Sequence, residues 1–479
     1  MDDRRRWWAL AAVTLGTFMT YLDNNIVNVA LPTIQRELEL DIAGLEWIVS
    51  GYILVFAGLM LVGGRLADVF GARRVFLAGL AVFTLASLGA GLAGDGGTLI
   101  GARAVQGIGA ALLTPTSLAL LSSTFTDPRE RGTAVGIWTS SGALSMALGP
   151  LTGGFISEYW HWGWIYLINV PVGALTLALA YWAVRPPRDG RVRRSLDLPG
   201  LVTSAIALFA LTYALIEGEG AGWTSGEILT AFGVAAAAAV AFVVAETRAA
   251  EPMIDLSLFR ARAFSGGTLS MGLWSFGVFG IYFFSALWLQ NVLGFTPTQA
   301  GAAFVPMALV MAVVAISAQR ISRLLGNGPT VALGLALMTG AIFAISRVGA
   351  GAAYGDILPW FLLYGLGGGM LVPLTTVILG ALPTGRAGVA SGVLNVSREV
   401  FGLLGVTVLG AILNARQSAA LEDGTAPLAA FLDGYQISLA IAAAIVLIGV
   451  PVSLYSLRAT ARPGRPAKDD DERRVPEPV

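Results

Sequence analysis

The sequence predicts an all-α membrane protein that crosses the bilayer about fourteen times, and three observations carry this prediction. Only 13% of the 479 residues are charged and 56% are hydrophobic, whereas soluble domains carry charge on about 25% of their residues. Apolar stretches of about 20 residues follow one another almost to the end of the chain, and each is long enough to cross about 30 Å of hydrocarbon. Sequence patterns also recur at a constant offset, which indicates a duplicated helical bundle.

Hydropathy places the fourteen spans along most of the chain. The expected spans are 8–30, 46–66, 75–94, 98–122, 134–157, 163–184, 198–216, 226–246, 265–290, 300–319, 329–346, 357–382, 390–413 and 434–457. Three arginines at positions 4–6 precede the first apolar run, as in a signal peptide. That run is too long for a signal peptide, contains Asp23 and leads directly into further spans, so we expect it to be retained as the first helix.

The placement of arginines predicts the orientation of the chain. Arginines gather in alternate connections and toward both ends of the chain, whereas the other connections hold only Arg36, Arg347 and Arg416. Because connections rich in Arg and Lys remain in the cytoplasm, we expect both termini there, as an even number of spans requires. The predicted location is the cell membrane (the inner or cytoplasmic membrane), which the chain crosses many times.

Composition also excludes several classes of site. The sequence contains no Cys and a single His, His161, so disulfides, thiolate metal sites and cysteine nucleophiles are excluded. It has no cluster of His, Asp and Glu at an interface and no nucleotide-binding motif, which argues against a lipid-modifying membrane enzyme and against ATP-driven transport. We expect no metal, no cofactor and no nucleic-acid partner. The expected partners are the lipid bilayer and a small amphipathic substrate, which can be a cation. The chain is expected to act as a monomer.

Three motifs recur at a separation of about 257 residues. The matched sets are Gly107, Gly109 and Pro115 with Gly365, Gly367 and Pro373; Gly132, Ala134 and Gly136 with Gly388, Ala390 and Gly392; and Ala43-Gly44 with Ala300-Gly301. This offset equates spans one to six with spans nine to fourteen and leaves spans seven and eight as an inserted pair. The alternative is chance matching of abundant glycines at helix interfaces.

The repeat predicts four regions. They are an N-terminal six-helix bundle in 1–184, a linker with two extra transmembrane helices in 185–264, a C-terminal six-helix bundle in 265–457, and a disordered cytoplasmic tail in 458–479. The tail mixes Pro with charges of both signs and has no apolar face. Two similar bundles can close a central cavity from either side in turn, which is what an alternating-access carrier requires.

Asp23 is the first candidate for proton binding. It lies past the middle of the first span, beside Asn24, Asn25 and Asn28. A charged group at the bilayer centre costs roughly 2.5–3.5 kcal/mol on insertion scales, so such groups usually face a polar cavity or a partner. Burial favours the protonated carboxyl and a nearby Arg favours the ionised one, so a conformational change could switch the proton affinity.

Two further charged positions lie within predicted spans. Arg103, early in the fourth span, reaches a depth comparable with that of Asp23 and could pair with it; a permanent ion pair that only fixes packing is the alternative. Arg398 and Glu399 are neighbours in span thirteen, so they point about 100° apart and should not face the same partner. Glu399 could be a second protonation or cation-recognition site, or a residue that snorkels to the cytoplasmic end or makes a gate contact there.

The segment from Gly64 to Arg74 joins spans two and three on the expected cytoplasmic side. Its glycines permit a tight turn, and Asp68 at a helix end can accept hydrogen bonds. The segment resembles the signature loop of the major facilitator superfamily, with Gly64, Asp68, Gly71, Arg73 and Arg74 at matching positions. The resemblance implies that Asp68 and these arginines form a cytoplasmic gate that stabilises the outward-open state.

Three more segments resemble the fourteen-span drug:proton antiporters of this superfamily. Asp23, Asn28 and Pro32 match the motif of the first helix, and Arg103 begins the motif of the fourth, in which the Arg is associated with proton transfer. The antiporter motif of the fifth helix is matched by Gly142, Gly149, Pro150, Gly153 and Gly154. Pro150 removes a backbone donor and bends the helix, while the glycines allow close approach of a neighbour.

The resemblance implies a major-facilitator fold, with two six-helix bundles plus two inserted helices. Asn25 stands where the family usually has Thr, and Glu399 stands where relatives commonly have Gln, which favours a cationic substrate. In the second half Gly405 is followed by Val406 rather than by proline, so the kink belongs to one half only. The expected proton-coupling and cavity residues are Asp23, Arg103, Glu399, Asn24, Asn28, Gln106 and Arg398.

The function that these observations favour is proton-coupled secondary active export of drug-like or antibiotic small molecules by alternating access. Protonation of Asp23 from outside and binding of substrate from inside would drive opposite halves of the cycle. The alternative keeps the same fold and makes the chain an importer or symporter of a metabolite. The motif at Gly149 and Pro150 argues against that alternative.

Overall fold

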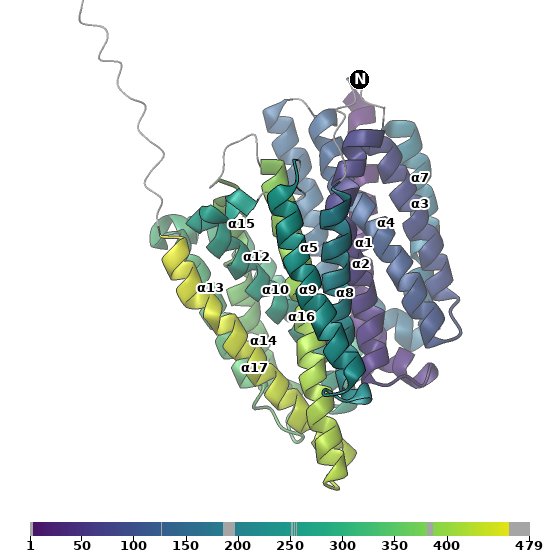
Figure 1. Ribbon diagram of the computed structural model, residues 1–479, viewed down its shortest axis with the longest axis vertical. Coiled ribbons are helices and arrows are strands. Elements are labelled where there is room, and N and C mark those ends of the chain that lie inside the picture. Colours follow the sequence, from purple (N-terminus) through teal and green to yellow (C-terminus); the bar gives the residue numbers. More distant parts are fainter. Residues whose placement is uncertain are drawn as a thin grey trace, which may run out of the picture.

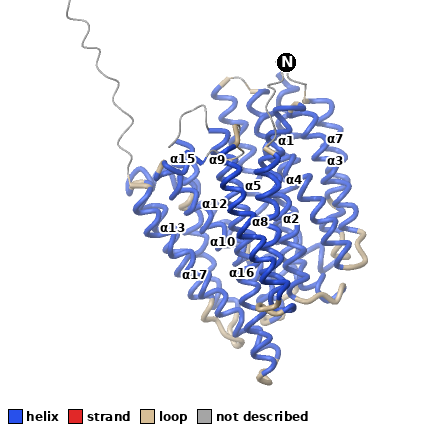
Figure 2. The backbone as a smooth tube through the Cα atoms, in the orientation of Figure 1, coloured by secondary structure: helices blue, strands red, loops and turns tan. Residues whose placement is uncertain are grey.

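The computed structural model describes residues 3–125, 127–184, 197–250, 252, 254, 256–380 and 387–458. All regular structure in these ranges is helical (Figure 2), so the prediction of an all-α protein is confirmed for them. The predicted tail at 458–479, apart from its first residue, and most of the arginine-rich connection after span six lie outside the described residues.

The helices run back and forth through one elongated bundle (Figure 1). We call the end at which the first helix begins the near end, and the opposite end the far end. The elements are α1 (Asp3–Glu37), α2 (Ile42–Phe70), α3 (Ala72–Gly91), α4 (Gly96–Thr124), α5 (Pro128–Tyr159), α6 (Trp164–Leu167), α7 (Asn169–Ala183), α8 (Leu198–Ala221), α9 (Gly226–Arg248), the 3-10 turn η1 (Leu256–Arg260), α10 (Arg262–Asn291), α11 (Pro297–Ala303), α12 (Val305–Leu325), α13 (Asn327–Ile345), α14 (Tyr354–Gly369), α15 (Val372–Gly380), α16 (Ala387–Glu422) and α17 (Pro427–Ser456).

Twelve helical segments in the described part of the chain are long and apolar enough to cross a membrane. The sequence predicts fourteen, and the two that fall short of this criterion are α1 and α5, with 35 and 32 residues. Length does not exclude them, since these helices extend about 52 and 48 Å. Their hydropathy is lower because α1 carries Asp23 and three asparagines, and α5 carries many Gly, Ser and Thr residues.

Three of the predicted spans are interrupted rather than continuous. The breaks lie between α6 and α7, between α11 and α12, and between α14 and α15. In each case a proline follows the break by two or three residues, at Pro171, Pro306 and Pro373. Because proline has no N–H to donate to the preceding turn, the helical hydrogen-bond ladder is interrupted there.

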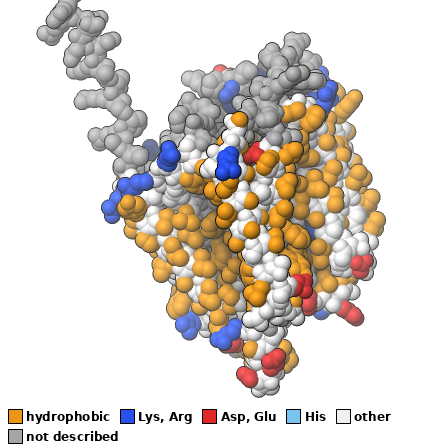
Figure 3. Space-filling view, viewed as in Figure 1, with side chains coloured by type: hydrophobic (Ala, Val, Ile, Leu, Met, Phe, Trp, Pro, Cys, Tyr) orange, Lys and Arg blue, Asp and Glu red, His pale blue; other side chains and the backbone are white. Residues whose placement is uncertain are grey.

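The helices form two groups with an extra pair between them. Helices α1–α7 pack together on one side and α10–α17 on the other, while α8 and α9 pack against each other (Figure 1). Helix α8 contacts both α2 of the first group and α16 of the second. Hydrophobic side chains cover the middle of the visible face and charged side chains lie toward its two ends (Figure 3), as a protein surrounded by lipid requires.

Two glycines of the predicted repeat make equivalent contacts in the two groups. In each group, the first glycine lies against the backbone of one neighbouring helix and the second lies against another, at distances that leave no room for a Cβ atom. The contacts are Gly107 with the carbonyl of Tyr52 on α2, Gly365 with that of Met307 on α12, Gly109 with that of Gly79 on α3, and Gly367 with that of Gly334 on α13. The same glycine pair therefore packs α4 and α14 onto corresponding partners.

Hydrogen bonds connect the two groups toward the far end. Gln290 Nε2 on α10 donates to the carbonyl of Val29 on α1, at 2.8 Å. The backbone N–H of Thr298, in the first turn of α11, donates to Glu158 Oε2 at the end of α5, at 3.0 Å.

A reciprocal glycine contact joins α5 to α11 in the same region. A Cβ atom on Gly154 would overlap the carbonyl of Pro297, and a Cβ on Gly301 would overlap the carbonyl of Pro150. The backbones of the two groups therefore touch directly, and the far end of the bundle is closed at this crossing.

Candidate functional site

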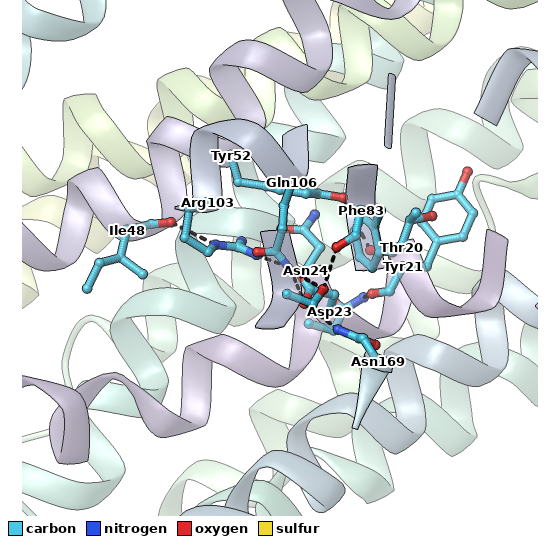
Figure 4. A network of polar contacts seen from close by, with 12 residues as sticks. Thr20, Tyr21, Asp23, Asn24, Ile48, Tyr52, Phe83, Arg103, Gln106 and Asn169 are labelled. Atoms are coloured by element: carbon cyan, nitrogen blue, oxygen red, sulfur yellow. Dashed lines mark hydrogen bonds and ion pairs between the residues drawn. The ribbon is translucent and has the colours of Figure 1, made fainter. Parts of the chain in front are cut away.

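Asp23 lies at the centre of a buried polar cluster built from three helices (Figure 4). Its side chain is 1% exposed, and that of Arg103 on α4 is fully buried. Arg103 Nη1 donates to Asp23 Oδ2 in an ion pair. The second carboxylate oxygen accepts from Gln106 Nε2 of α4 at 3.1 Å and from Asn169 Nδ2 of α7 at 2.9 Å. Both oxygens of Asp23 are therefore hydrogen-bonded without any contact to the second helical group.

The guanidinium of Arg103 is held by more than Asp23. Its Nε donates to the carbonyl of Ile48 on α2 at 3.1 Å. The ring of Tyr52 lies 4.3 Å from the guanidinium carbon and that of Tyr166 lies 5.6 Å from it, which adds cation-π attraction in a desolvated place. Arg103 Nη2 has no hydrogen-bond partner among the described residues, so the cation retains one buried donor for a further ligand.

Gln106 also links the cluster to α3. Its Nε2 also donates to Ser87 Oγ on α3 at 2.8 Å, and its Oε1 accepts from Arg103 Nη1 at 3.0 Å. The amide is therefore fixed with its N–H groups toward the carboxylate. Since Asp23 accepts hydrogen bonds from α4 and α7, a movement of α1 relative to these helices would remove donors and favour protonation of the carboxyl.

Asn24 and Asn28 lie beside Asp23 on α1 but outside its hydrogen bonds. Asn28 Nδ2 donates to the carbonyl of Asn24 at 3.3 Å, which is a bond within the helix. Asn24 Oδ1 is buried and has no partner among the described residues. Of the predicted cavity residues, the structure thus brings Asp23, Arg103 and Gln106 together and leaves the two asparagines as neighbours.

Arg398, which is partly exposed, and the buried Glu399 form a second charged pair, on α16. Arg398 Nη2 donates to Glu399 Oε1 at 2.8 Å and its Nε does so at 3.2 Å. The two side chains meet because the long arginine side chain folds back along the helix, a contact that the sequence does not predict. Glu399 is 1% exposed and so does not snorkel, and its Oε2 has no partner among the described residues.

The second pair faces the helix that carries Asp23. The guanidinium carbon of Arg398 lies 5.6 Å from the ring of Tyr21 on α1. Tyr21 precedes Asp23 by two residues, so the pair on α16 and the cluster on α1 occupy neighbouring parts of the boundary between the two groups.

The predicted gate residues lie at the near end, where α2 gives way to α3. Gly71 joins these helices with φ of +89°, a left-handed conformation that glycine adopts without strain. Arg73 Nη2 donates to the carbonyl of Tyr181 at 2.7 Å, within the same helical group. Gly64 lies on α2 near Pro115, and Arg74 is exposed. The side chain of Asp68 lies outside the described part of the structure.

The glycines of the predicted antiporter motif on α5 face two different helices. A Cβ atom on Gly149 would lie 2.6 Å from Asn25 Cβ, and one on Gly153 would overlap the carbonyl of Ile26. A Cβ atom on Gly142 would face another part of α1, 3.5 Å from the Tyr21 ring. Gly154 instead contacts α11, as described above, and Pro150 lies inside α5.

Two buried residues of this region are absent from the sequence-based set. Asn169 lies in a predicted span, but nothing in the sequence shows that its amide meets Asp23. Glu46 on α2 is 2% exposed, and it stands at the first position of the predicted span 46–66. An acidic residue at the start of a span is ordinarily solvated, so its burial could be found only from the packing.

Comparison with known proteins identifies the family. Residues 13–406 match the sequence profile of the Major Facilitator Superfamily. The chain is 36% identical over 459 residues to a puromycin resistance protein of Streptomyces alboniger, covering 93% of this chain and 90% of that protein. It is 33% identical over 498 residues to a tetracenomycin C resistance and export protein of Streptomyces glaucescens, covering 95% and 92%.

Solved structures give the same fold. A bacterial homologue of the human lysosomal transporter Spinster, in an inward-facing and unoccupied conformation, superimposes with a TM-score of 0.67. The sequence identity is 17%, and the match covers 95% of this chain and 98% of that one. The resemblance to the major facilitator superfamily is thereby confirmed, and the chain belongs to this superfamily of membrane transporters.

Proposed function

We propose that this transporter exports antibiotic-like small molecules in exchange for protons, with Asp23 as the principal proton-binding group. The observation that carries the proposal is the buried cluster in which Asp23 accepts hydrogen bonds from Arg103, Gln106 and Asn169. A buried carboxylate balanced by one arginine can be tipped toward either protonation state by a small movement of its donors. The name of the tetracenomycin C resistance and export protein supports the export direction.

The proposed cycle exchanges one ligand for the other. In the state with the far end open, a proton from outside joins the Asp23 carboxylate and neutralises it, which weakens the attraction to Arg103. In the state with the near end open, substrate binds and the proton leaves to the cytoplasm. A carrier that changes conformation only when loaded with proton or with substrate couples the two flows.

The proposal includes a topology of fourteen spans with both termini in the cytoplasm. Helices α1 and α5 are long enough to cross, and both are packed against their group rather than lying apart from it. Arginines such as Arg5, Arg73 and Arg262 lie at the near end, which supports its cytoplasmic placement. The protein would then sit in the cytoplasmic membrane and act as a monomer.

The proposed substrate is a small amphipathic molecule, with a preference for cations. The support is the unpartnered Oε2 of Glu399, which is buried beside the boundary between the helical groups. A buried acceptor with no protein donor is available to a cationic or hydrogen-bonding ligand. The ring of Tyr21 lies near the same pair and can supply an aromatic face.

The decisive experiment is uptake of a fluorescent drug into inside-out vesicles, or its efflux from whole cells, under an imposed proton gradient. Wild-type protein should move the drug against its concentration gradient only when the proton gradient is present. Asp23→Asn should abolish the gradient dependence, whereas Asp433→Asn, a change at an exposed far-end carboxylate, should leave it intact. Transport by the wild type that ignores the gradient would remove proton coupling from the proposal.

The same experiment separates the two directions of transport. An importer or symporter would accumulate its substrate with the proton flux rather than against it. The direction of drug movement relative to the proton gradient therefore decides between the exporter and the metabolite importer.

A further inference from the structure

Glu46 is a buried acid that takes no part in the proposed proton exchange at Asp23. It lies in the second turn of α2, toward the far end, and is 2% exposed. Its Oε2 has no hydrogen-bond partner among the described residues. Among the residues that the structure describes, no cation pairs with this carboxyl, in contrast to Asp23.

The carboxyl of Glu46 lies against the second helical group. A Cβ atom on Gly410 of α16 would overlap Oε1 and Cδ of Glu46. The absence of a side chain at Gly410 is therefore what lets the carboxyl fit between α2 and α16. Because these helices belong to different groups, this contact exists only while the far end of the bundle is closed.

The extra helix α8 covers the same contact. Trp47 Nε1 on α2 donates to Glu217 Oε1 on α8 at 2.7 Å, and α8 also packs on α16. Glu46 thus occupies a three-helix junction of α2, α8 and α16. Water reaches it only if one of these contacts opens.

The charged groups around Glu46 do not compensate a negative charge. Asp41, which caps α2, and Glu217 of α8 are both acidic and act on it electrostatically. From α4, Arg103 is engaged by Asp23 and by the carbonyl of Ile48. From α16, Arg416 lies 3.8 Å from Asp433 and pairs with it instead.

A carboxylate that is buried without a cation, and with one oxygen that has no hydrogen-bond donor, is strongly disfavoured, and the group takes up a proton instead. With the junction open, the same carboxyl is hydrated and ionises. Closure of the far end and protonation of Glu46 must then favour each other, because the closed state favours the neutral carboxyl and the neutral carboxyl favours the closed state.

We propose that Glu46 is a second proton-binding group, which takes a proton from the far-side water and thereby permits α2 and α16 to close. The step is the addition of one proton to the carboxylate oxygen to give the neutral carboxyl, and no other bond changes. The inference rests on the proposed function, in which far-side protons drive the return of the empty carrier. It assigns to Glu46 control of far-end closure, whereas Asp23 retains the exchange with substrate.

The test measures closure directly, without substrate or gradient. The chain contains no cysteine, so spin labels can be attached at G94C and G351C in the full-length protein in lipid nanodiscs. Both glycines lie in far-end connections of different groups, and a side chain there meets nothing within 4 Å. The label separation, measured by pulsed electron spin resonance, reports the proportion of closed and open far ends.

The measurement uses the Asp23→Asn background, so that Asp23 does not contribute to the titration. Between pH 8.5 and 5.5 the ratio of closed to open protein should rise up to about tenfold for each pH unit, as uptake of one proton requires. Adding Glu46→Gln should give a closed far end with a flat pH response. Adding Asp433→Asn, at an exposed far-end acid, should leave the slope unchanged. A steep slope that persists with Glu46→Gln overturns the inference.

A second variant keeps the inference testable if Glu46→Gln does not fold. Gly410→Ala places a methyl group where the Glu46 carboxyl lies, so it should shift the population toward the open far end at every pH. The double change Glu46→Ala with Gly410→Ala should restore closure without pH dependence. A Gly410→Ala protein that closes like its parent also overturns the inference.

The outcomes separate this inference from the proposed function. A flat response in Glu46→Gln supports pH-controlled closure even if efflux proves independent of the proton gradient. A response that Glu46→Gln leaves unchanged removes Glu46 from the cycle, even if gradient-driven efflux through Asp23 is demonstrated.

Discussion

Removing the Arg103 guanidinium alone should destabilise the protein far more than removing it in a protein whose Asp23 has already lost its charge. Both side chains are at most 1% exposed, and breaking a buried pair from one side costs about 3–5 kcal/mol because a buried charge is left behind. Arg103→Met retains most of the apolar stem, so this cost reports the lost charge rather than lost packing. With Asp23→Asn also present, we expect a cost smaller by about 2–3 kcal/mol.

Protonation limits this penalty and gives it a pH dependence. In Arg103→Met, Asp23 can escape its unpaired state by taking up a proton, which becomes easier by about 1.4 kcal/mol for each pH unit of acidification. The destabilisation measured at pH 7 should therefore shrink as the pH falls toward 5. In the double variant, which has no carboxyl at position 23, the destabilisation should not change with pH.

The assay is unfolding of the four proteins in mixed micelles with increasing sodium dodecyl sulfate, followed by tryptophan fluorescence at several pH values. The two single changes and the double change form a double-mutant cycle. Additive costs, or a cost of Arg103→Met that is the same at pH 5 and pH 7, would refute the assignment of Asp23 and Arg103 as a coupled buried pair.

Three further predictions follow from the closed far end and from the second charged pair. Gly154→Ala should reduce transport at least tenfold because its methyl group would overlap the backbone of α11, whereas Gly136→Ala on the same helix, which meets nothing within 4 Å, should be neutral in the same efflux assay. Glu158 lies beyond the predicted span that ends at 157 and accepts a hydrogen bond from the backbone N–H of Thr298. Burial raises the pKa of its carboxyl, but the hydrogen bonds from Thr296, Thr298 and Tyr159 lower the pKa below the ordinary value of 4.5. The stabilisation of the closed far end by Glu158 is therefore present above pH 4.5 and lost as the pH falls through the lowered pKa, so Glu158→Gln should widen the label separation at pH 7 and match the parent in strong acid. Glu399→Gln should lower efflux of cationic drugs at least tenfold relative to neutral ones, and equal losses for both classes would count against cation recognition.

The class of fold could be predicted because lipid imposes a simple rule on sequence. Apolar stretches of sufficient length predicted the helices, and the structure mostly extends them beyond the predicted ends: α1 runs from Asp3 to Glu37 where the sequence predicts 8–30. Polar end residues such as Arg5 continue the helix outside the hydrocarbon, so hydropathy does not detect them. The three broken spans had a visible cause in Pro171, Pro306 and Pro373, but proline also occurs inside unbroken helices such as α5.

The candidate site could be predicted only in part, because charge is visible in a sequence and packing is not. Asp23 and Arg103 stood out as costly charges in apolar spans, and the structure pairs them. Asn169 is neutral and distant in sequence, so its hydrogen bond to Asp23 depends on how α7 packs. Glu46 was hidden by its place at the start of a predicted span, and only the contact with Gly410 reveals its burial.

The pair on α16 shows the same limit in another form. The helical geometry of adjacent residues predicts that Arg398 and Glu399 do not face the same partner, and it does not address a contact between the two side chains. The structure pairs them, because arginine has enough rotatable bonds to reach its neighbour. Backbone periodicity therefore predicts faces of a helix more reliably than the partners of long side chains.

Counterflow in liposomes tests the exchange of proton for substrate most directly. Purified protein is reconstituted with a pH-sensitive dye inside, equal pH on both sides and a gradient of drug alone. As the drug runs down its gradient, wild-type protein should drive protons in the opposite direction, and Asp23→Asn should move drug without moving protons. Drug flux through the wild-type protein with no change in internal pH would contradict proton exchange at Asp23.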